Sequence, residues 1–211
     1  MMTIVASPPT PIELFNSRAF RVLLDCLARP GKIGQLPPPP YSDLPPLPDG
    51  RPPNTTAVAA CMSLLDQRVS FVHAHDNRWL TDDQPLSRWI TLRSGSRVVA
   101  PAIADFALLH DTASLSLLSD LQEGSLIYPE QSCTAFLCVS DLVANGNTFR
   151  LTGPGIAGAA TVGIASHYPM NINLLVARRD RFPLGIDLFL IDDHGRCLGI
   201  PRTTRILITT S

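Results

Sequence analysis

The stretch that decides the fold runs from Arg181 to Thr204 and reads RFPLGIDLFLIDDHGRCLGIPRTT. Between Ile186 and Ile191 the side chains alternate with a period of two, which is typical of a β-strand. A polar turn at 192–195 and a second apolar run over 197–200 follow. The segment therefore predicts a β-hairpin.

The length of the turn decides which residues of this hairpin face each other. A two-residue loop at His194-Gly195 pairs Asp193 with Arg196. The same register places Asp187 opposite Arg202. An Asp on a buried strand needs a partner, because an isolated charge in apolar surroundings is very costly. We therefore predict a structural ion pair between Asp187 and Arg202, which a loop one residue longer would break.

Composition bounds the class of protein. The chain has 211 residues, 45% of them hydrophobic and 17% charged, which is enough for one folded domain with a buried core. A formal net charge of −1 gives no electrostatic footprint for nucleic acid or an anionic membrane. We find no apolar run of the roughly 20 residues that a membrane helix needs and no signal peptide, so we expect a cytoplasmic protein.

The distribution of proline suggests how the domain is organised. We expect a flexible tail over residues 1–14 and a single α/β domain over residues 15–211, whose first helix is capped by Asn16 or Ser17. Residues 37–53 hold nine prolines in 17 residues and cannot pair inside a sheet. We interpret them as a surface arm, which either docks a partner or is a solvated connection.

Cysteine, histidine and lysine give weak signals for metals and cofactors. None of the five cysteines lies in a C-x-x-C pair, which favours buried reduced thiols. His73 and His75 would share a face of a strand, but no third ligand accompanies them, so metal binding is a minor alternative. The single lysine is Lys32, in a turn after Pro30-Gly31, and a pyridoxal-phosphate enzyme needs a lysine for its Schiff base. We therefore expect no pyridoxal phosphate.

A second hairpin is predicted by Asn145-Gly146, which lies between apolar runs at 133–144 and 148–152. A two-residue loop there places Asp141 opposite Arg150, a second predicted structural ion pair.

The next segment, Gly153–Gly158, formally matches G-x-G-x-x-G. Pro154 removes one backbone donor and the preceding strand belongs to a hairpin, so we interpret the segment as a turn. Dinucleotide binding and a phosphate lodged on this turn stay open as alternatives.

Three stretches resemble one protein family. FPLGIDLFL with GIPRTT near the C-terminus, Phe20–Leu24 leading to Pro30-Gly31, and LTGPGI at 151–156 are similar to the H-type subunit of the bacterial carbon–phosphorus lyase core complex. The matches occur in the family's order and span Phe20 to Thr204. The resemblance implies an α/β fold with a mixed β-sheet and helices packed on both faces. That fold is similar to the large domain of pyridoxal-phosphate-dependent transferases, without the cofactor site.

The resemblance also implies a role and partners. The family subunit is required for transfer of the ribose 5-triphosphate moiety of ATP to an alkylphosphonate, with release of adenine. We expect an essential, non-catalytic subunit of this multi-subunit transferase, a homodimer in isolation, that joins the other core subunits of the G, I and J types. No catalytic residue, metal, nucleic acid or membrane partner is expected.

Two other functions stay open: a stand-alone phosphate- or phosphonate-binding protein, and a cofactor-dependent transferase. Hydroxyl donors and a planar guanidinium suit phosphate or carboxylate. Five positions are therefore candidates for contacting an anion or another subunit: Gly153, Gly155, Arg202, Thr203 and Thr204. Arg202 cannot fully serve both Asp187 and a ligand, and the ion pair has the first claim.

Overall fold

The computed structural model describes residues 8–142, 147–171, 173–176 and 181–208. The strands of the larger sheet are β1 (Ile33–Gln35), β2 (Ser70–His75), β3 (Arg78–Leu80), β4 (Arg97–Val98), β5 (Phe106–Leu109), β6 (Thr134–Cys138), β9 (Asp187–Ile191) and β10 (Arg196–Ile200). The smaller sheet contains β7 (Asn147–Thr152), β8 (Ala160–Ile164) and β11 (Arg205–Ile208). The helices are α1 (Pro11–Ala28), α2 (Thr55–Met62), α3 (Pro85–Ser94) and α4 (Asn173–Val176), with 3-10 segments η1 (Pro101–Ile103), η2 (Thr112–Asp120) and η3 (Pro129–Gln131).

The larger sheet is mixed, as the resemblance implied. Its strand order is β1-β10-β9-β6-β5-β2-β3, with β4 also pairing with β2. Strands β2, β5, β6 and β9 run parallel to one another, whereas β1, β10 and β3 pair antiparallel to their neighbours. The smaller sheet, β11-β7-β8, is antiparallel. The α/β class with a mixed sheet is therefore confirmed.

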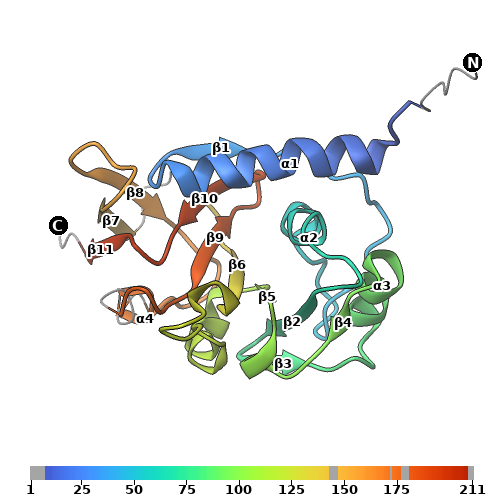
Figure 1. The fold of residues 1–211 in the computed structure, drawn as a ribbon. Coiled ribbons are helices and arrows are strands. Elements are labelled where there is room, and N and C mark those ends of the chain that lie inside the picture. The colour runs from blue at the N-terminus through green and yellow to red at the C-terminus, as the bar shows by residue number, and fades with distance from the viewer. Residues whose placement is uncertain (1–7, 143–146, 172, 177–180, 209–211) are drawn as a thin grey trace, which may run out of the picture.

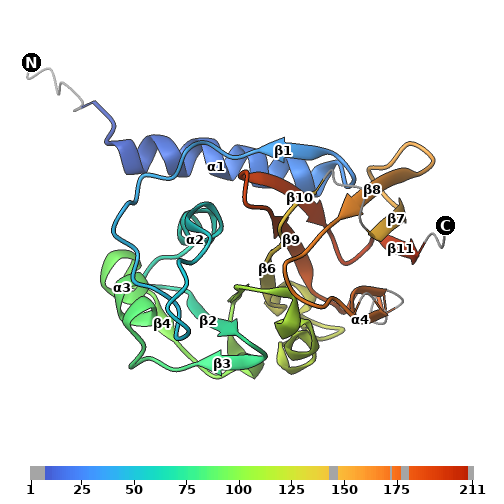
Figure 2. The same cartoon turned by 180° about the vertical axis from the view of Figure 1, so that it is seen from behind.

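The two faces of the large sheet carry separate cores. Phe71, Phe136 and Phe189 point to one face, where they pack with apolar side chains of α1, α2 and α3. Leu137 and Leu190 point to the other face, which is covered by η2, α4 and the small sheet. This alternation follows from the period of two along each strand. Figures 1 and 2 show the small sheet beside β10 at one end of the molecule and α3 at the other. Helices thus share the second face with a sheet, which the prediction did not include.

Helix α1 begins earlier than predicted. Thr10 caps it, because its hydroxyl accepts a hydrogen bond from the backbone N–H of Glu13 and the Glu13 carboxylate accepts one from that of Thr10. Residues 11–14 therefore belong to α1 and not to the expected tail. Asn16 and Ser17 lie inside the helix and do not cap it. Residues 1–7 lie outside the described part of the chain. Further along, α1 lies directly against β10, where a Cβ on Gly199 would stand 2.6 Å from the backbone carbon of Cys26. Only glycine permits this approach.

The proline-rich arm lies against the helical face instead of projecting from it. The Tyr41 ring packs edge-on against Trp89 of α3, with 5.1 Å between ring centroids, and Leu47 is buried. Asp43 pairs with Arg93 at 2.6 Å. These contacts fix the middle of the arm, which leads to the polar edge described below.

The β9–β10 hairpin forms, but its register differs from the prediction by one residue. Leu188 faces Ile200 and Ile191 faces Cys197, so the loop has three residues, 193–195, and Gly195 takes a positive φ of 73°. Asp192, not Asp193, then lies opposite Arg196. A type I turn followed by a left-handed glycine is a common three-residue hairpin loop.

The ion pair between Asp187 and Arg202 is nevertheless present. Arg202 Nη2 lies 2.7 Å from Asp187 Oδ2, and the backbone N–H of Arg202 donates to Asp187 Oδ1 at 2.8 Å. A loop one residue longer did not break the pair, contrary to our expectation. Arg202 lies in the turn beyond β10, where its long side chain can reach the carboxylate from outside the strand register.

The second predicted hairpin is wrong. Strand β6 pairs with β5 and β9, so both its edges are taken, while β7 pairs with β8 and β11. Asp141 pairs with Arg196 at 3.0 Å, and Arg150 lies opposite Thr161 in the small sheet. The Asn145-Gly146 loop itself lies outside the described residues. Gly153–Gly158 connects two antiparallel strands, which excludes the strand-to-helix geometry of a dinucleotide fingerprint.

Candidate functional site

The carboxyl ends of the four parallel strands meet at one edge of the large sheet. His75 ends β2, His110 and Asp111 directly follow β5, and Ser140 and Asp141 lie just beyond β6. Asp192 and Asp193 follow β9 in the same way. In open α/β sheets ligands bind in the crevice outside these strand ends. We therefore take this edge as the candidate functional site.

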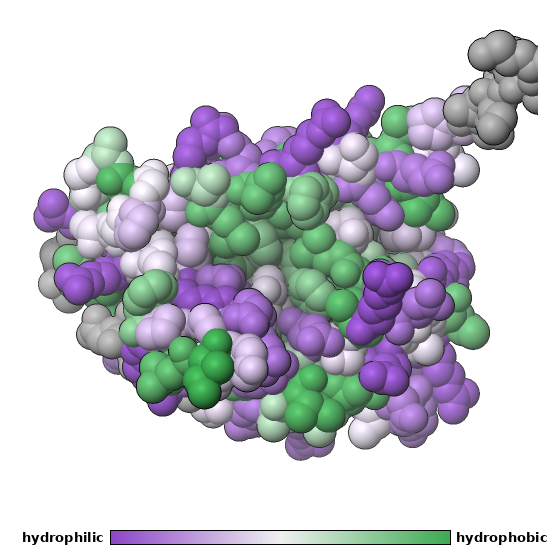
Figure 3. All heavy atoms as spheres, viewed as in Figure 1, coloured by the Kyte–Doolittle hydropathy of each residue, from purple (hydrophilic) through white to green (hydrophobic). Residues whose placement is uncertain are grey.

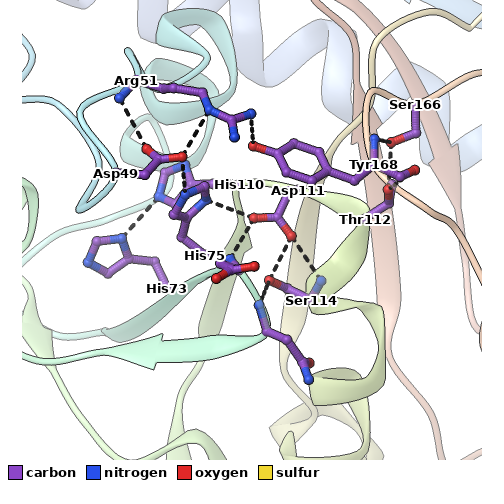
Figure 4. A network of polar contacts seen from close by, with 12 residues as sticks. Asp49, Arg51, His73, His75, His110, Asp111, Thr112, Ser114, Ser166 and Tyr168 are labelled. Carbon is purple, nitrogen blue, oxygen red and sulfur yellow. Dashed lines mark hydrogen bonds and ion pairs between the residues drawn. The ribbon is translucent and has the colours of Figure 1, made fainter.

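His75 links the proline-rich arm to the sheet edge. Its Nε2 lies 3.0 Å from an Asp49 oxygen and its Nδ1 lies 2.8 Å from an Asp111 oxygen (Figure 4). Both N···O distances are short, but neither contact has the geometry of a hydrogen bond. Asp111 is buried and also accepts hydrogen bonds from the backbone N–H and hydroxyl of Ser114 at 2.9 Å and from the backbone N–H of Asp76 at 2.8 Å.

Arg51 of the proline-rich arm and Tyr168 of the segment after β8 meet over the strand ends. The Arg51 Nε lies 2.9 Å from Asp49, and Nη1 donates to the Tyr168 hydroxyl at 2.5 Å (Figure 4). The backbone carbonyl of Tyr168 accepts a hydrogen bond from the Thr112 hydroxyl at 3.2 Å. Partial burial raises the pKa of the Tyr168 phenol. The arm and the segment after β8 are thus joined over the strand ends.

Two cavities adjoin at Arg51 and Tyr168, which line both. The first, of about 260 Å³, is lined mainly by residues after β5, β6 and β8 together with the start of α2, among them Asn54, His110, Asp111, Ser140, Ser166 and Asp193. The second, of about 360 Å³, lies on the β2–β3 side and is lined by Asp49, His75, Asp76 and Arg78. The site therefore offers arginine side chains and several hydrogen-bond acceptors around an open space.

A chain of hydrogen bonds fixes the proton positions on two buried histidines. The Ser87 hydroxyl donates to the carbonyl of Thr81 at 2.7 Å, so its oxygen must accept from Nε2–H of His73 at 2.6 Å. Burial lowers the pKa of His73 to about 3 and the pKa of His110 well below 6.5, so both rings are neutral. His73 Nδ1 is then an acceptor, and His110 Nε2–H donates to it at 3.0 Å. Nδ1 of His110 consequently carries a lone pair, and it has no hydrogen-bond partner.

At the β9 end of the sheet edge, hydrogen bonds from within the chain occupy the Asp192 carboxylate. Asp192 is fully buried, and its two oxygens accept from the backbone N–H groups of Leu142, His194 and Arg196 at 2.9–3.1 Å. The Arg196 side chain adds a bond from Nε at 2.6 Å. These bonds shape the β9–β10 loop and leave Asp192 no role in binding.

The structure places the predicted anion-binding positions away from these two cavities. Gly153 lies against Thr203 and Thr204, since a Cβ on Gly153 would stand 2.9 Å from the Thr203 carbonyl oxygen. Gly155 instead packs against the end of α1, and Arg202 is occupied by Asp187 and by the Pro129 carbonyl at 2.6 Å. The turn at Gly153 thus lies against residues 203–204, and whether these positions bind an anion stays a prediction.

Sequence reasoning missed the residues that converge at the sheet edge. Asp49, Arg51 and Tyr168 lie in segments without regular spacing, and no spacing in the sequence marks His110 and Asp111 as part of a site. The signal that could have revealed this site is a pair of polar residues directly after a buried apolar strand, as at 106–111.

Among the described residues, no group of three or more His, Cys, Asp or Glu side chains could hold a metal, and all five cysteines are buried and free. In the same part of the chain, no helix has the length and apolar character of a membrane span.

Comparison with known proteins places this fold and site in a family. Residues 14–207 match the family described as bacterial phosphonate metabolism protein (PhnH). The chain belongs to the PhnH family. The match runs from α1 to β11 and so includes both sheets and every residue of the sheet-edge site.

Two curated relatives agree with the PhnH assignment. The chain is 30% identical over 192 residues to the alpha-D-ribose 1-methylphosphonate 5-triphosphate synthase subunit PhnH of Rhizobium meliloti (strain 1021), covering 89% of this chain and 88% of the relative. It is 31% identical over 189 residues to HtxG of Stutzerimonas stutzeri, whose name refers to a C-P lyase subunit, covering 89% and 84%. The resemblance seen in the sequence is therefore confirmed.

Proposed function

We propose that the chain is a subunit of a multi-subunit synthase that makes ribose 1-methylphosphonate 5-triphosphate in phosphonate breakdown. The observation that carries this proposal is the end-to-end similarity to a relative named as a subunit of that synthase, over 89% of this chain and 88% of the relative. In the proposed reaction the bond from the ribose C1′ of ATP to adenine breaks, and a bond from C1′ to a phosphonate oxygen forms.

We further propose that this chain positions substrate or partners and does not carry the groups that make and break these bonds. The acids at the sheet edge are engaged: Asp111 holds His75 and η2, and Asp192 holds the β9–β10 loop. Carboxylates committed to several donors are poor candidates for general bases. This saturation supports a non-catalytic role.

Pyridoxal phosphate does not suit these residues. The only lysine, Lys32, lies just beyond α1, and its Nζ pairs with Asp25 at 2.7 Å. It does not line either of the two cavities. Because a Schiff base needs a lysine beside the cofactor, this placement supports a function without pyridoxal phosphate.

Contact with other subunits, and a homodimer in their absence, also belong to the proposal. Phe20 and Leu24, one turn apart on α1, are 51% and 57% exposed, and Leu126 and Ile127 at a turn tip are 76% and 79% exposed. Figure 3 shows apolar side chains gathered along α1 and toward α2. Contiguous exposed apolar surface of this kind is typical of protein interfaces.

Co-purification tests the proposal directly. The tagged chain is isolated from cells grown on methylphosphonate, and the accompanying proteins are identified by mass spectrometry. We expect the remaining synthase subunits in stoichiometric amounts, and we expect synthase activity only in the complete assembly. A chain that purifies alone, or that releases adenine from ATP without other proteins, contradicts the proposal.

A second candidate function is that of a stand-alone binding protein for a phosphorylated molecule, and the two cavities at the sheet edge favour it. Such a protein binds its ligand but purifies without the synthase subunits. The predicted anion positions at Gly153, Gly155, Arg202, Thr203 and Thr204 belong to this alternative. A cofactor-dependent transferase is a third class, and an aldimine absorbance lost in Lys32→Ala would support it.

A further inference from the structure

A further cavity, of about 370 Å³, lies between α3 and β4. Strand β4 pairs with Ser70 and Phe71 at the start of β2, whereas His75 of the candidate site is the last residue of that strand. The residues that line the α3–β4 cavity are Asp82, Arg88, Thr91, Leu92, Arg97 and Val98. None of them lines either cavity of the sheet-edge site, so this is a separate surface.

The arginines of the α3–β4 cavity are not neutralised within the chain. Arg88 and Arg97 are exposed, and among the described residues neither guanidinium has an ion-pair or hydrogen-bond partner. By contrast, Arg93 of the same helix pairs with Asp43 at 2.6 Å. One aspartate, Asp82, accompanies the two arginines in the cavity wall, which leaves a positive excess. The cavity therefore favours a negatively charged group.

The apolar part of the wall is also uncovered. Leu92 is 82% exposed, and Val98 is partly buried. Leu92 follows Arg88 by four residues, so the two side chains lie on the same face of α3. The opposite face of this helix is anchored in the core by other residues, Leu86, Trp89 and Ile90. Leu92 is therefore free to contact an apolar group that comes from outside the chain.

The outer edge of β4 adds backbone hydrogen-bonding groups to this surface. Within the described part of the chain, β4 pairs with β2 alone. The backbone N–H of Val99 donates to the Phe71 carbonyl at 3.1 Å. Successive residues of a strand direct their backbone groups to opposite edges, so the N–H and C=O of Val98 point away from β2. An open edge of this kind can pair with an extended segment of another chain.

We propose that the α3–β4 cavity docks an extended acidic segment of a partner subunit. The backbone of the segment bonds to Val98, an apolar side chain covers Leu92, and a carboxylate binds the guanidinium groups of Arg88 and Arg97. That the partner is a synthase subunit rests on the proposed function. The extended and acidic character of the segment rests on the open edge and the two unpaired arginines.

Charge reversal tests the docking. The tagged full chain is isolated from cells grown on methylphosphonate, and the accompanying synthase subunits are quantified by mass spectrometry. Arg88→Glu combined with Arg97→Glu should reduce their recovery about tenfold, because like charges then face each other across the interface. Arg150→Glu combined with Arg205→Glu is the matched control: it changes the net charge equally at two exposed arginines of the small sheet, and recovery should stay unchanged. Full recovery with the first variant, or an equal loss in the control, overturns the proposal.

Cross-linking identifies the occupant without altering the charges. Leu92→Cys places an exposed thiol at the cavity, while the five native cysteines are buried, and a benzophenone maleimide is attached to it. We expect a photo-cross-link to one partner subunit, in a segment that carries Asp or Glu beside an apolar residue. A cross-link to a second copy of this chain, to a segment without acidic residues or to no subunit overturns the proposal.

The two proposals can be told apart in the same experiment. If the wild-type chain recovers no synthase subunit, the proposed function fails and the docking fails with it. If the wild-type chain and the Arg88→Glu, Arg97→Glu variant recover the subunits equally, only the docking at the α3–β4 cavity fails.

Discussion

Arg202 offers the sharpest test of the scaffold, because its guanidinium joins three segments. It contacts Asp187 at the start of β9 through Nε at 3.3 Å and Nη2 at 2.7 Å, and it donates through Nη1 to the Pro129 carbonyl at 2.6 Å. The two side chains are only 15% and 22% exposed. Arg202→Ala removes these side-chain bonds, while the backbone N–H of residue 202 continues to donate to the Asp187 carboxylate.

The size of the expected loss of stability depends on the hydrogen bond that Asp187 keeps in the variant. Breaking a fully buried ion pair by removing one partner costs about 3–5 kcal/mol. The retained backbone bond and the partial exposure of both groups reduce this, so we expect a loss of about 2–4 kcal/mol in the free energy of unfolding. For a chain of 211 residues this corresponds to a fall of about 5–15 °C in Tm.

Urea unfolding of four proteins measures the pair itself: wild type, Arg202→Ala, Asp187→Ala and the double variant. We expect the double variant to be less destabilised than the sum of the two single variants, because the second deletion no longer leaves a buried charge alone. Arg150→Ala is the matched control, since Arg150 is exposed on β7, and its effect should stay within about 0.5 kcal/mol. An unchanged Tm in Arg202→Ala, together with loss of growth on phosphonate, would refute the structural role and assign Arg202 to function.

The other predictions concern the buried histidines, the α1–β10 contact and the exposed turn. As the pH falls through about 6.5, the two histidines take up protons in the unfolded chain, while His73 and His110 stay neutral in the fold. The free energy of unfolding therefore decreases below about pH 6.5. Urea titrations should show a decrease of about 1–3 kcal/mol from pH 7.5 to 5.5. A pH-independent unfolding free energy over that range contradicts neutral histidines. Gly199→Ala forces a Cβ to within 2.6 Å of the α1 backbone and should cost about 1–3 kcal/mol, whereas an unchanged Tm would mean that α1 is not held at this distance. Leu126→Ser with Ile127→Ser should leave Tm unchanged but reduce recovery of partner subunits; full recovery removes this turn from the interface.

Side-chain chemistry could be predicted from the sequence more successfully than the pairing of the strands. The Asp187–Arg202 pair could be predicted because a semi-buried carboxylate demands a cation, and a long arginine satisfies that demand in more than one register. The register itself depended on whether Gly195 adopts a left-handed conformation in a three-residue loop, which the sequence leaves open. The Asn145-Gly146 signal was local, and it could not show that β5 and β9 occupy both edges of β6.

The site at the sheet edge was not predictable from spacing. Asp49, His75 and Asp111 are brought together because parallel strands end at the same edge and the proline-rich arm returns across it. Such convergence depends on strand order, which a single sequence does not fix. His110 directly follows an apolar strand in the sequence, but its hydrogen bonds depend on the positions of Ser87 and His73 in the fold.

The most direct test of the central claim, that a hydrogen-bond chain from Ser87 fixes two neutral rings at His73 and His110 below the strand ends, is the tautomeric state of these two histidines. Long-range ¹H–¹⁵N correlation spectra of the full chain distinguish a protonated ring nitrogen from one that carries a lone pair, and His73→Gln and His110→Asn assign the signals. We predict that both rings are neutral with the proton on Nε2. A proton on Nδ1 of His110, or a doubly protonated ring at pH 7, would contradict the account.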